Sequence, residues 1–140
     1  ALRGKAGTRR ILRVQVKSSR SYVRERVNFW FGNFARKYRP GVADVYLLVG
    51  IYPAYAPRRP VTSGAWKTII LAVLDREMKK LLPTIKTKAG EEDRFFGFGF
   101  EPPARGAPRK VSWNRGRIEG TDCSRFLLAR RQEEIARVLE

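Results

Sequence analysis

Two polar side chains stand two positions apart in a stretch whose pattern predicts a β-strand. From Leu12 onward, apolar and polar residues alternate, so Gln15 and Lys17 fall on one face and the apolar residues fall on the other. Alternate side chains of a strand lie about 7 Å apart along it. A side-chain oxygen beside a lysine at this spacing can help to hold a divalent cation, while the ammonium group orients an attacking water or stabilises the charge of a phosphate. The same pattern is also typical of the solvent face of an edge strand, where lysine is common.

The rest of the composition narrows the chemistry that such a pair could support. The 140 residues include no histidine and one cysteine, Cys123, for which we expect a half-buried structural position. Histidine-dependent triads, histidine ligands and cysteine-based zinc sites are therefore excluded. Any metal would be held by oxygen, which suits Mg²⁺, Mn²⁺ or Ca²⁺. Asp44 is a candidate oxygen ligand, although a carboxylate at the start of an apolar strand is more often a cap or the partner of an arginine.

The charge of the chain is strongly positive and unevenly distributed. Thirty Lys and Arg against thirteen Asp and Glu give a formal net charge of +17, and residues 1–39 carry twelve of these cations beside one acidic residue, Glu25. Such an excess usually indicates a polyanionic partner, most often nucleic acid, and it exceeds what solubility alone requires. The side chains expected to line a phosphate track are Arg9, Arg10, Arg13, Arg20, Arg24, Arg26, Arg36, Lys37, Arg39, Arg58 and Arg59.

The length and the apolar content predict one folded domain over residues 1–140, because 43% apolar residues suffice for a core. No apolar run approaches about 18 residues, so the sequence predicts no membrane span. The first residues lack the apolar stretch of a secretory signal. We therefore expect an intracellular protein, cytoplasmic or associated with the nucleoid.

Hydrophobic periodicity predicts the elements that must position these side chains. The segment 22–38 is ambiguous and favours a strand followed by a short helix. A helix with Asp75 as its N-cap is expected to run to about Ile85, with an early end or a kink at Pro83. A last helix is expected from Cys123 or Ser124 to about Leu139. Strands are predicted over 9–17, ending before Ser18, and over 43–52, 66–74 and 95–100. This mixed order predicts an α/β or α+β fold, with a single mixed β-sheet flanked by helices.

The segment around the Gln-X-Lys pair resembles the (D/E)XK strand of the PD-(D/E)XK nuclease superfamily, in the variant where Gln replaces the acid. The following order also fits this family: an aromatic segment, a buried strand, and a strand–helix pair. The resemblance covers roughly residues 9–85 and implies a restriction-endonuclease-like core that hydrolyses phosphodiester bonds in DNA with Mg²⁺ or Mn²⁺. It implies that Gln15 and Lys17 are catalytic, and that Gln15, with a weaker contribution from Asp44, lies at the metal.

One part of the family pattern is missing from the chain. The pattern requires an Asp, the main metal ligand, on the strand before the Gln-X-Lys strand, and no acidic residue precedes Glu25. The chain could be a fragment whose preceding strand lies upstream of Ala1. The ligand could instead come from elsewhere, such as Asp44 or Glu25. In the third explanation the site is inactive and the domain only binds.

Two other functions stay open beside the endonuclease hypothesis. The first is a non-catalytic nucleic-acid-binding module with a degenerate nuclease fold. The second is a structural protein that binds ribosomal RNA, since small size and high positive charge are typical of that group. DNA is favoured over RNA as the partner, because buried strands and two Pro/Gly-rich loops indicate a domain with a cleft. Many nucleases of the resembled type dimerise to cut two strands, so a homodimer is a further expectation.

Overall fold

The fold is α+β and contains two packed β-sheets, where the sequence predicted one. The computed structural model describes the residues 2–3, 9–23, 25–54, 64–85, 95–103, 106–114 and 116–138. Within these residues, one sheet has the strand order β3-β6-β7 and another has the order β4-β5-β8-β9. A short antiparallel pair, β1 (Leu2–Arg3) with β2 (Arg9–Arg10), precedes them. The predicted single sheet flanked by helices is therefore wrong.

The three-stranded sheet contains the Gln-X-Lys segment at one of its edges. β3 (Val14–Arg20) pairs in parallel with β6 (Val45–Pro53), which pairs antiparallel with β7 (Trp66–Leu74). The strands predicted over 43–52 and 66–74 are confirmed, whereas the strand predicted over 9–17 is divided: Arg9–Arg10 belong to β2, and β3 begins at Val14 and continues through the serines expected to end it. β6 was predicted to be buried on both faces, but its alternate residues are fully buried on one face and half-buried on the other.

The four-stranded sheet is aromatic and tightly packed. Its strands are β4 (Tyr22–Val23), β5 (Val27–Gly32), β8 (Phe95–Phe100) and β9 (Ser112–Asn114), all antiparallel. A Cβ at Gly97 would collide with the carbonyl oxygen of Phe29, so the alternation of Phe and Gly in β8 lets β5 approach closely. β5 therefore pairs with β8, and the chain forms a second sheet where the sequence predicted an extension of the first.

Three helices and three 3₁₀ turns complete the described part of the chain. They are α1 (Phe34–Lys37), α2 (Asp75–Leu81) followed by the turn Leu82–Ile85, the turns Gly116–Ile118 and Ser124–Phe126, and α3 (Leu128–Arg137). The early end or kink predicted at Pro83 is confirmed: α2 ends at the turn that contains this residue, because proline lacks the amide proton of a regular helix. Its N-cap is Leu74, and Glu77 accepts a hydrogen bond from the Leu74 N–H at 2.9 Å. No described helix is long and apolar enough to cross a membrane.

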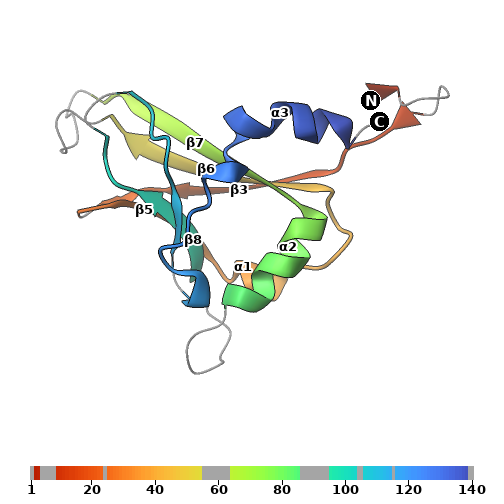
Figure 1. Ribbon diagram of the computed structural model, residues 1–140, viewed down its shortest axis with the longest axis horizontal. Coiled ribbons are helices and arrows are strands. Elements are labelled where there is room, and N and C mark those ends of the chain that lie inside the picture. Colours follow the sequence, from red (N-terminus) through yellow and green to blue (C-terminus); the bar gives the residue numbers. More distant parts are fainter. Residues whose placement is uncertain are drawn as a thin grey trace.

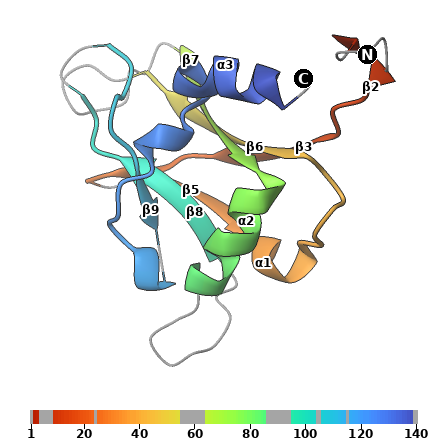
Figure 2. The ribbon, with the colours of Figure 1, turned by 45° about the vertical axis from the view of Figure 1, so that its right-hand side comes forward.

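The main hydrophobic core lies between the two sheets. Side chains of β5 and β8, such as Phe29 and Phe98, meet Tyr46 and Leu48 of β6 in one cluster. On the opposite face of the three-stranded sheet, α3 packs against a smaller cluster of β6 and β7 residues. Figures 1 and 2 show this arrangement, with α3 on one side of β6 and β7 and with β5 and β8 on the other. Cys123 belongs to the main core and is fully buried, deeper than predicted.

Candidate nucleic-acid interface

Gln15 and Lys17 lie on the face of β3 that is directed toward the second sheet. Their register partners in β6 are Tyr46 and Leu48, which are both buried in the core between the sheets. Register partners on neighbouring strands point to the same side of a sheet. Gln15 and Lys17 are themselves only half-buried, because β3 is the edge strand and the core ends beneath β6. The two polar side chains therefore line the outer margin of the space between the sheets.

Ser19 continues this row and connects β3 to the second sheet. The Ser19 hydroxyl accepts a hydrogen bond from the Trp30 N–H of β5 at 3.2 Å. Away from this contact, β3 pairs with β6 while β5 pairs with β8, so the two sheets diverge (Figure 2). Ser19 was not predicted as a site residue, although its position two residues after Lys17 continues the same period. The polar row of β3 thus begins at the junction of the sheets and leads out along the open edge.

The other face of β3 is apolar and exposed. Val14 and Val16 are 44% and 58% exposed, and Ile11, just before the strand, is 76% exposed. α3 covers neighbouring β6 on this face but not the edge strand itself. Within the described residues, β3 pairs with β6 alone. At the outer edge of β3, the exposed apolar side chains therefore lie beside backbone groups that no described strand pairs with.

Asp44 is bound to Arg13 and belongs to the end of the sheet. Its carboxylate accepts hydrogen bonds from Arg13 Nη2 at 2.9 Å, from Nε at 3.3 Å and from the backbone N–H at 2.9 Å. Arg13 Nη1 also donates to the Gly41 carbonyl at 2.7 Å. The hydrogen bond and the charge of Asp44 raise the pKa of Arg13. The alternative in which Asp44 is the partner of an arginine is the one seen here, and Arg13, predicted to contact phosphate, is engaged by this carboxylate.

A second carboxylate, Asp75, closes the same end of the sheet. Its oxygens accept hydrogen bonds from the Tyr38 hydroxyl at 2.7 Å and from the Gly41 N–H at 3.2 Å, and Lys79 Nζ lies 3.4 Å away. Burial, followed by the hydrogen bond to Asp75, raises the pKa of Tyr38. Both Asp44 and Asp75 therefore hold the loop between α1 and β6 in place.

These contacts decide how well the described residues fit a divalent cation. No cluster of three or more His, Cys, Asp or Glu side chains occurs in the described part of the chain. Beside Lys17, β3 supplies one neutral oxygen ligand, the carboxamide of Gln15, while the carboxylate of Asp44 is already bound by an arginine. Mg²⁺ is usually held by one or two carboxylates. The described donor set does not fit this ion, and we derive no reaction step through a metal.

The remaining predicted phosphate contacts fall into three groups. Arg26 is half-buried and donates to the Ser112 hydroxyl at 2.7 Å. Arg39 is exposed, and its Nη1 donates to the carbonyls of Arg36 and Tyr38, which holds it against α1. The others with described side chains are exposed, namely Arg20, Arg36 and Lys37. The side chains of Arg9 and Arg10, and the whole of Arg24, Arg58 and Arg59, lie outside the described residues.

One buried cation, Arg131 of α3, was not predicted from the sequence. Its side chain is 4% exposed and donates to both Glu77 oxygens, at 2.7 and 2.8 Å, and to the Ala72 carbonyl at 2.6 Å. Glu134 lies 3.0 Å from the same guanidinium group. Because every donor direction is used within the protein, Arg131 connects α3 to β7 and α2 and is not a nucleic-acid contact.

Comparisons with known proteins found no match, so the fold is interpreted from its own geometry. The chain matches no protein-family model, no curated protein and no solved structure.

Proposed function

We propose that this chain is a DNA-binding, endonuclease-like domain in which the Gln15–Lys17 face of β3 contacts a phosphodiester. The observation that carries the proposal is the polar row of an edge strand, half-buried at the point where two sheets diverge, on a chain with a net charge of +17. The element order β3, β4, β5, α1, β6, β7, α2 includes the aromatic strand, the buried strand and the strand–helix pair in the order that the nuclease resemblance implies, although β5 lies in a second sheet. Each of these features supports a phosphate-binding role, and together they favour it over a merely solvated edge.

Lys17 supplies the charge for this contact. Within the described residues, no carboxylate lies within ion-pair distance of its ammonium group, in contrast to Arg13 and Arg131. An ammonium group that is half-buried and not neutralised locally attracts a phosphate more strongly than a fully hydrated one. Its three donors can contact two phosphate oxygens or one oxygen and a water molecule.

Gln15 supplies orientation without charge. Its amide NH₂ can donate to a phosphate oxygen and its carbonyl oxygen can accept from a water molecule. Hydrolysis by the mechanism of the resembled family also needs a carboxylate ligand, which the described residues do not bring to Gln15. DNA binding has no such requirement. Binding is therefore the function that the geometry supports best, and hydrolysis at this face would need a carboxylate ligand from outside the described residues.

Binding is tested by fluorescence anisotropy with a short labelled DNA duplex over a series of salt concentrations. Lys17→Ala is compared with Lys67→Ala, which removes the same charge from an exposed position on the opposite edge of the sheet. If Lys17 contacts a phosphate, its loss weakens binding about tenfold and lowers the salt slope by about 1, whereas Lys67→Ala has a smaller effect. Equal effects of the two variants would show that only the net charge matters. A structured RNA that displaces the duplex at low concentration would favour the ribosomal alternative.

Hydrolysis is tested separately with supercoiled plasmid in Mg²⁺ or Mn²⁺. Cutting that Lys17→Ala abolishes and Lys67→Ala retains would support catalysis on the β3 face. Binding without cutting would restrict the proposal to the DNA-binding part.

A further inference from the structure

We infer that the outer edge of β7 and the groove beside it bind an extended peptide segment of another protein, with apolar side chains at alternate positions and at least one acidic residue. This site lies on the edge of the three-stranded sheet opposite to β3. It does not depend on the proposed DNA-binding function.

The hydrogen bonds at both ends of β7 show which of its backbone N–H and C=O groups point toward β6 and which point away. The Ala54 N–H donates to the Ala65 carbonyl at 2.9 Å, and the Asp75 N–H donates to the Asp44 carbonyl at 3.0 Å. Each of these pairs stands directly opposite in the register of β6 and β7. Because such pairs alternate along an antiparallel ladder, the even-numbered residues of β7 direct their N–H and C=O groups away from β6. Thr68 therefore presents its backbone outward.

The C-terminal half of this outer edge is already occupied by the protein. The outward Ala72 carbonyl accepts from Arg131, and the outward Leu74 N–H donates to Glu77. Leu127 forms an isolated antiparallel bridge with Leu71, immediately before the chain turns into α3. The edge of β7 thus forms an antiparallel bridge with the chain at one residue, and beyond this residue the bridging segment turns away into α3.

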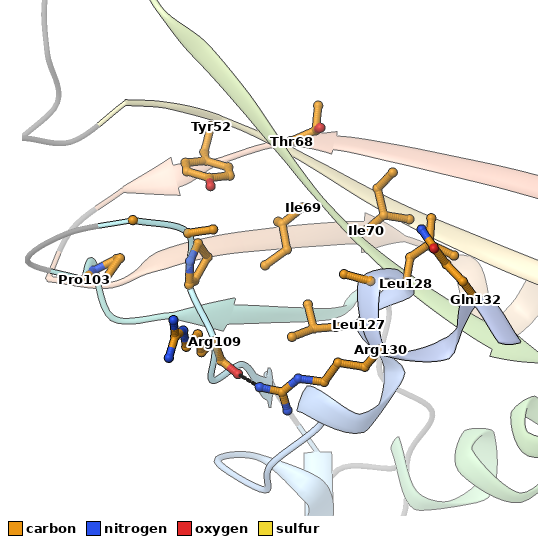
Figure 3. A pocket seen from close by; sticks show the side chains of 14 residues that line it. Tyr52, Thr68, Ile69, Ile70, Pro103, Arg109, Leu127, Leu128, Arg130 and Gln132 are labelled. Carbon is orange, nitrogen blue, oxygen red and sulfur yellow. Dashed lines mark hydrogen bonds between the residues drawn. The ribbon is translucent and has the colours of Figure 1, made fainter. Parts of the chain in front are cut away.

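The N-terminal half of the edge opens into a groove of about 720 Å³. Figure 3 shows β7 along one wall, Pro103 and the segment 106–109 along another, and the start of α3 at the far end. Thr68 is exposed at this edge, and within the described residues no side chain or strand pairs with its outward backbone groups. The volume lies within the range of about 300–1,000 Å³ typical of ligand sites. A strand of several residues at about 3.4 Å per residue fits along the exposed half of β7.

The lining defines the chemistry of the occupant. Ile69 and Leu127 are nearly buried and form an apolar floor, with Tyr52 at its end. Arg109 and Arg130 are the charged lining residues, and the Arg130 guanidinium donates to the Arg109 carbonyl at 2.8 Å (Figure 3). None of the described residues that line the groove carries a carboxylate. An edge strand supplies main-chain hydrogen bonds, an apolar floor selects alternate side chains, and two arginines select an acid, which together describe binding by strand addition.

The same features disfavour nucleic acid in this groove. A phosphate backbone would leave the apolar floor and the outward amide and carbonyl groups of Thr68 without suitable partners. An extended peptide supplies partners for the apolar floor and for both the amide and the carbonyl group of Thr68. Addition of a strand to β7 also extends a sheet that ends there in the described part of the chain.

The test begins with a selection of peptides from a library of random short sequences displayed on phage, against the full chain. We expect enriched sequences in which apolar residues alternate and an acid recurs. The best peptide is then synthesised with a fluorescent label, and its affinity is measured by anisotropy. In Thr68→Pro, which removes the outward N–H where a proline is tolerated at an edge, we expect a loss of about tenfold or more. The matched Thr68→Val retains the N–H and should bind within about twofold of the wild type.

The charge and the backbone are then tested independently of the stability of Thr68→Pro. Arg109→Glu with Arg130→Glu should weaken the labelled peptide about tenfold, while the exposed Arg117→Glu changes it little. N-methylation of alternate peptide bonds in the ligand should abolish binding to the wild-type chain at one set of positions and not at the other. Failure of the selection to enrich any sequence, equal affinity for Thr68→Pro, or N-methylation without a period of two would each overturn the inference. Displacement of the peptide by duplex DNA, lost in the double arginine variant, would reassign the groove to nucleic acid.

Discussion

The two outer edges of the three-stranded sheet meet their surroundings in different ways. The edge of β7 is half closed by side chains of α2 and α3, and its open half lies at the floor of a groove. The edge of β3 has no strand beyond it in the described residues and has a polar face and an exposed apolar face. One edge thus offers main-chain hydrogen bonds in an apolar groove, and the other offers an uncompensated lysine near the junction of two sheets.

The difference shows how one sheet can serve two kinds of partner. Backbone groups select an extended chain whatever its side chains, whereas a lysine and a carboxamide on a strand face select a phosphate whatever its sequence. The physical reason for the contrast is the placement of acidic residues. Glu77 and Glu134 meet Arg131 at the β7 edge, while Asp44, the carboxylate that contacts the residue before β3, is bound by Arg13.

The largest effect is expected where the β7 edge is closed. Arg131→Met removes a buried guanidinium group and leaves Glu77 and the Ala72 carbonyl without their donor. We expect the free energy of unfolding to fall by about 3 kcal/mol or more, measured by urea denaturation. The control is Arg137→Met, at a position 70% exposed, which should change stability by less than about 0.5 kcal/mol. Equal losses in the two variants would show that the β7 edge is not closed by Arg131.

The next effect concerns the polar face of β3. Gln15→Ala combined with Lys17→Ala should weaken the affinity for duplex DNA more than Lys17→Ala alone, by about a further 1 kcal/mol for a lost neutral hydrogen bond. Ser18→Ala serves as the control, because Ser18 lies on the opposite face of the strand. The measurement is the anisotropy titration described above. An unchanged affinity in the double variant would remove the polar row from the interface.

A smaller effect depends on pH. The hydrogen bond from Arg131 holds the pKa of Glu134 below its ordinary value, so the folded state binds this proton more weakly than the unfolded state. The resulting stability is present above the ordinary value and is lost as the pH falls through the lowered one. Because Glu134 is 48% exposed, the contribution should be less than about 1 kcal/mol. Glu134→Gln should flatten the acid limb of the stability curve by that amount, measured by denaturation at a series of pH values, and Glu133→Gln should not.

The smallest effect tests whether the apolar face of β3 is free. Val14→Thr with Val16→Thr should change the free energy of unfolding by less than about 0.5 kcal/mol, because both side chains are already exposed. Val45→Thr makes the same chemical change at the buried register partner of Val14 and should cost about 1–3 kcal/mol. Thermal unfolding of the three proteins gives the comparison. A large loss in the β3 variant would show that something covers this face in solution.

The sequence predicted individual elements better than their pairing. The alternation that ends at Lys17 and the apolar run of β6 located two strands, and the range 66–74 of β7 was predicted without error. The pairing of β5 with β8 was not predicted, because it depends on the contact between the backbones at Phe29 and Gly97. The sequence indicated close packing by glycine in β8 but not which strand would approach.

The placement of Gln15 and Lys17 on one strand face could be predicted, whereas the ionic partners of the nearby charges could not. Gln15 and Lys17 lie on one strand face as their period required, whereas the binding of Asp44 to Arg13 needed the fold of the intervening residues. Arg131 looked like any other arginine of a basic helix, since its burial depends on β7 and α2. The sequence does not indicate that the backbone of Thr68 points away from β6, because this depends on which residues of β6 and β7 form the hydrogen-bonded pairs.

The reaction of Cys123 with a thiol reagent can report local unfolding of the protein. Its side chain is fully buried in the main core, and burial, followed by the charge of Asp122, raises the pKa of its thiol. A thiol reagent reacts with the exposed thiolate, so labelling requires the segment between β9 and α3 to leave the core first. Because Cys123 is the only cysteine of the chain, the rate of labelling measures that local unfolding without an engineered probe.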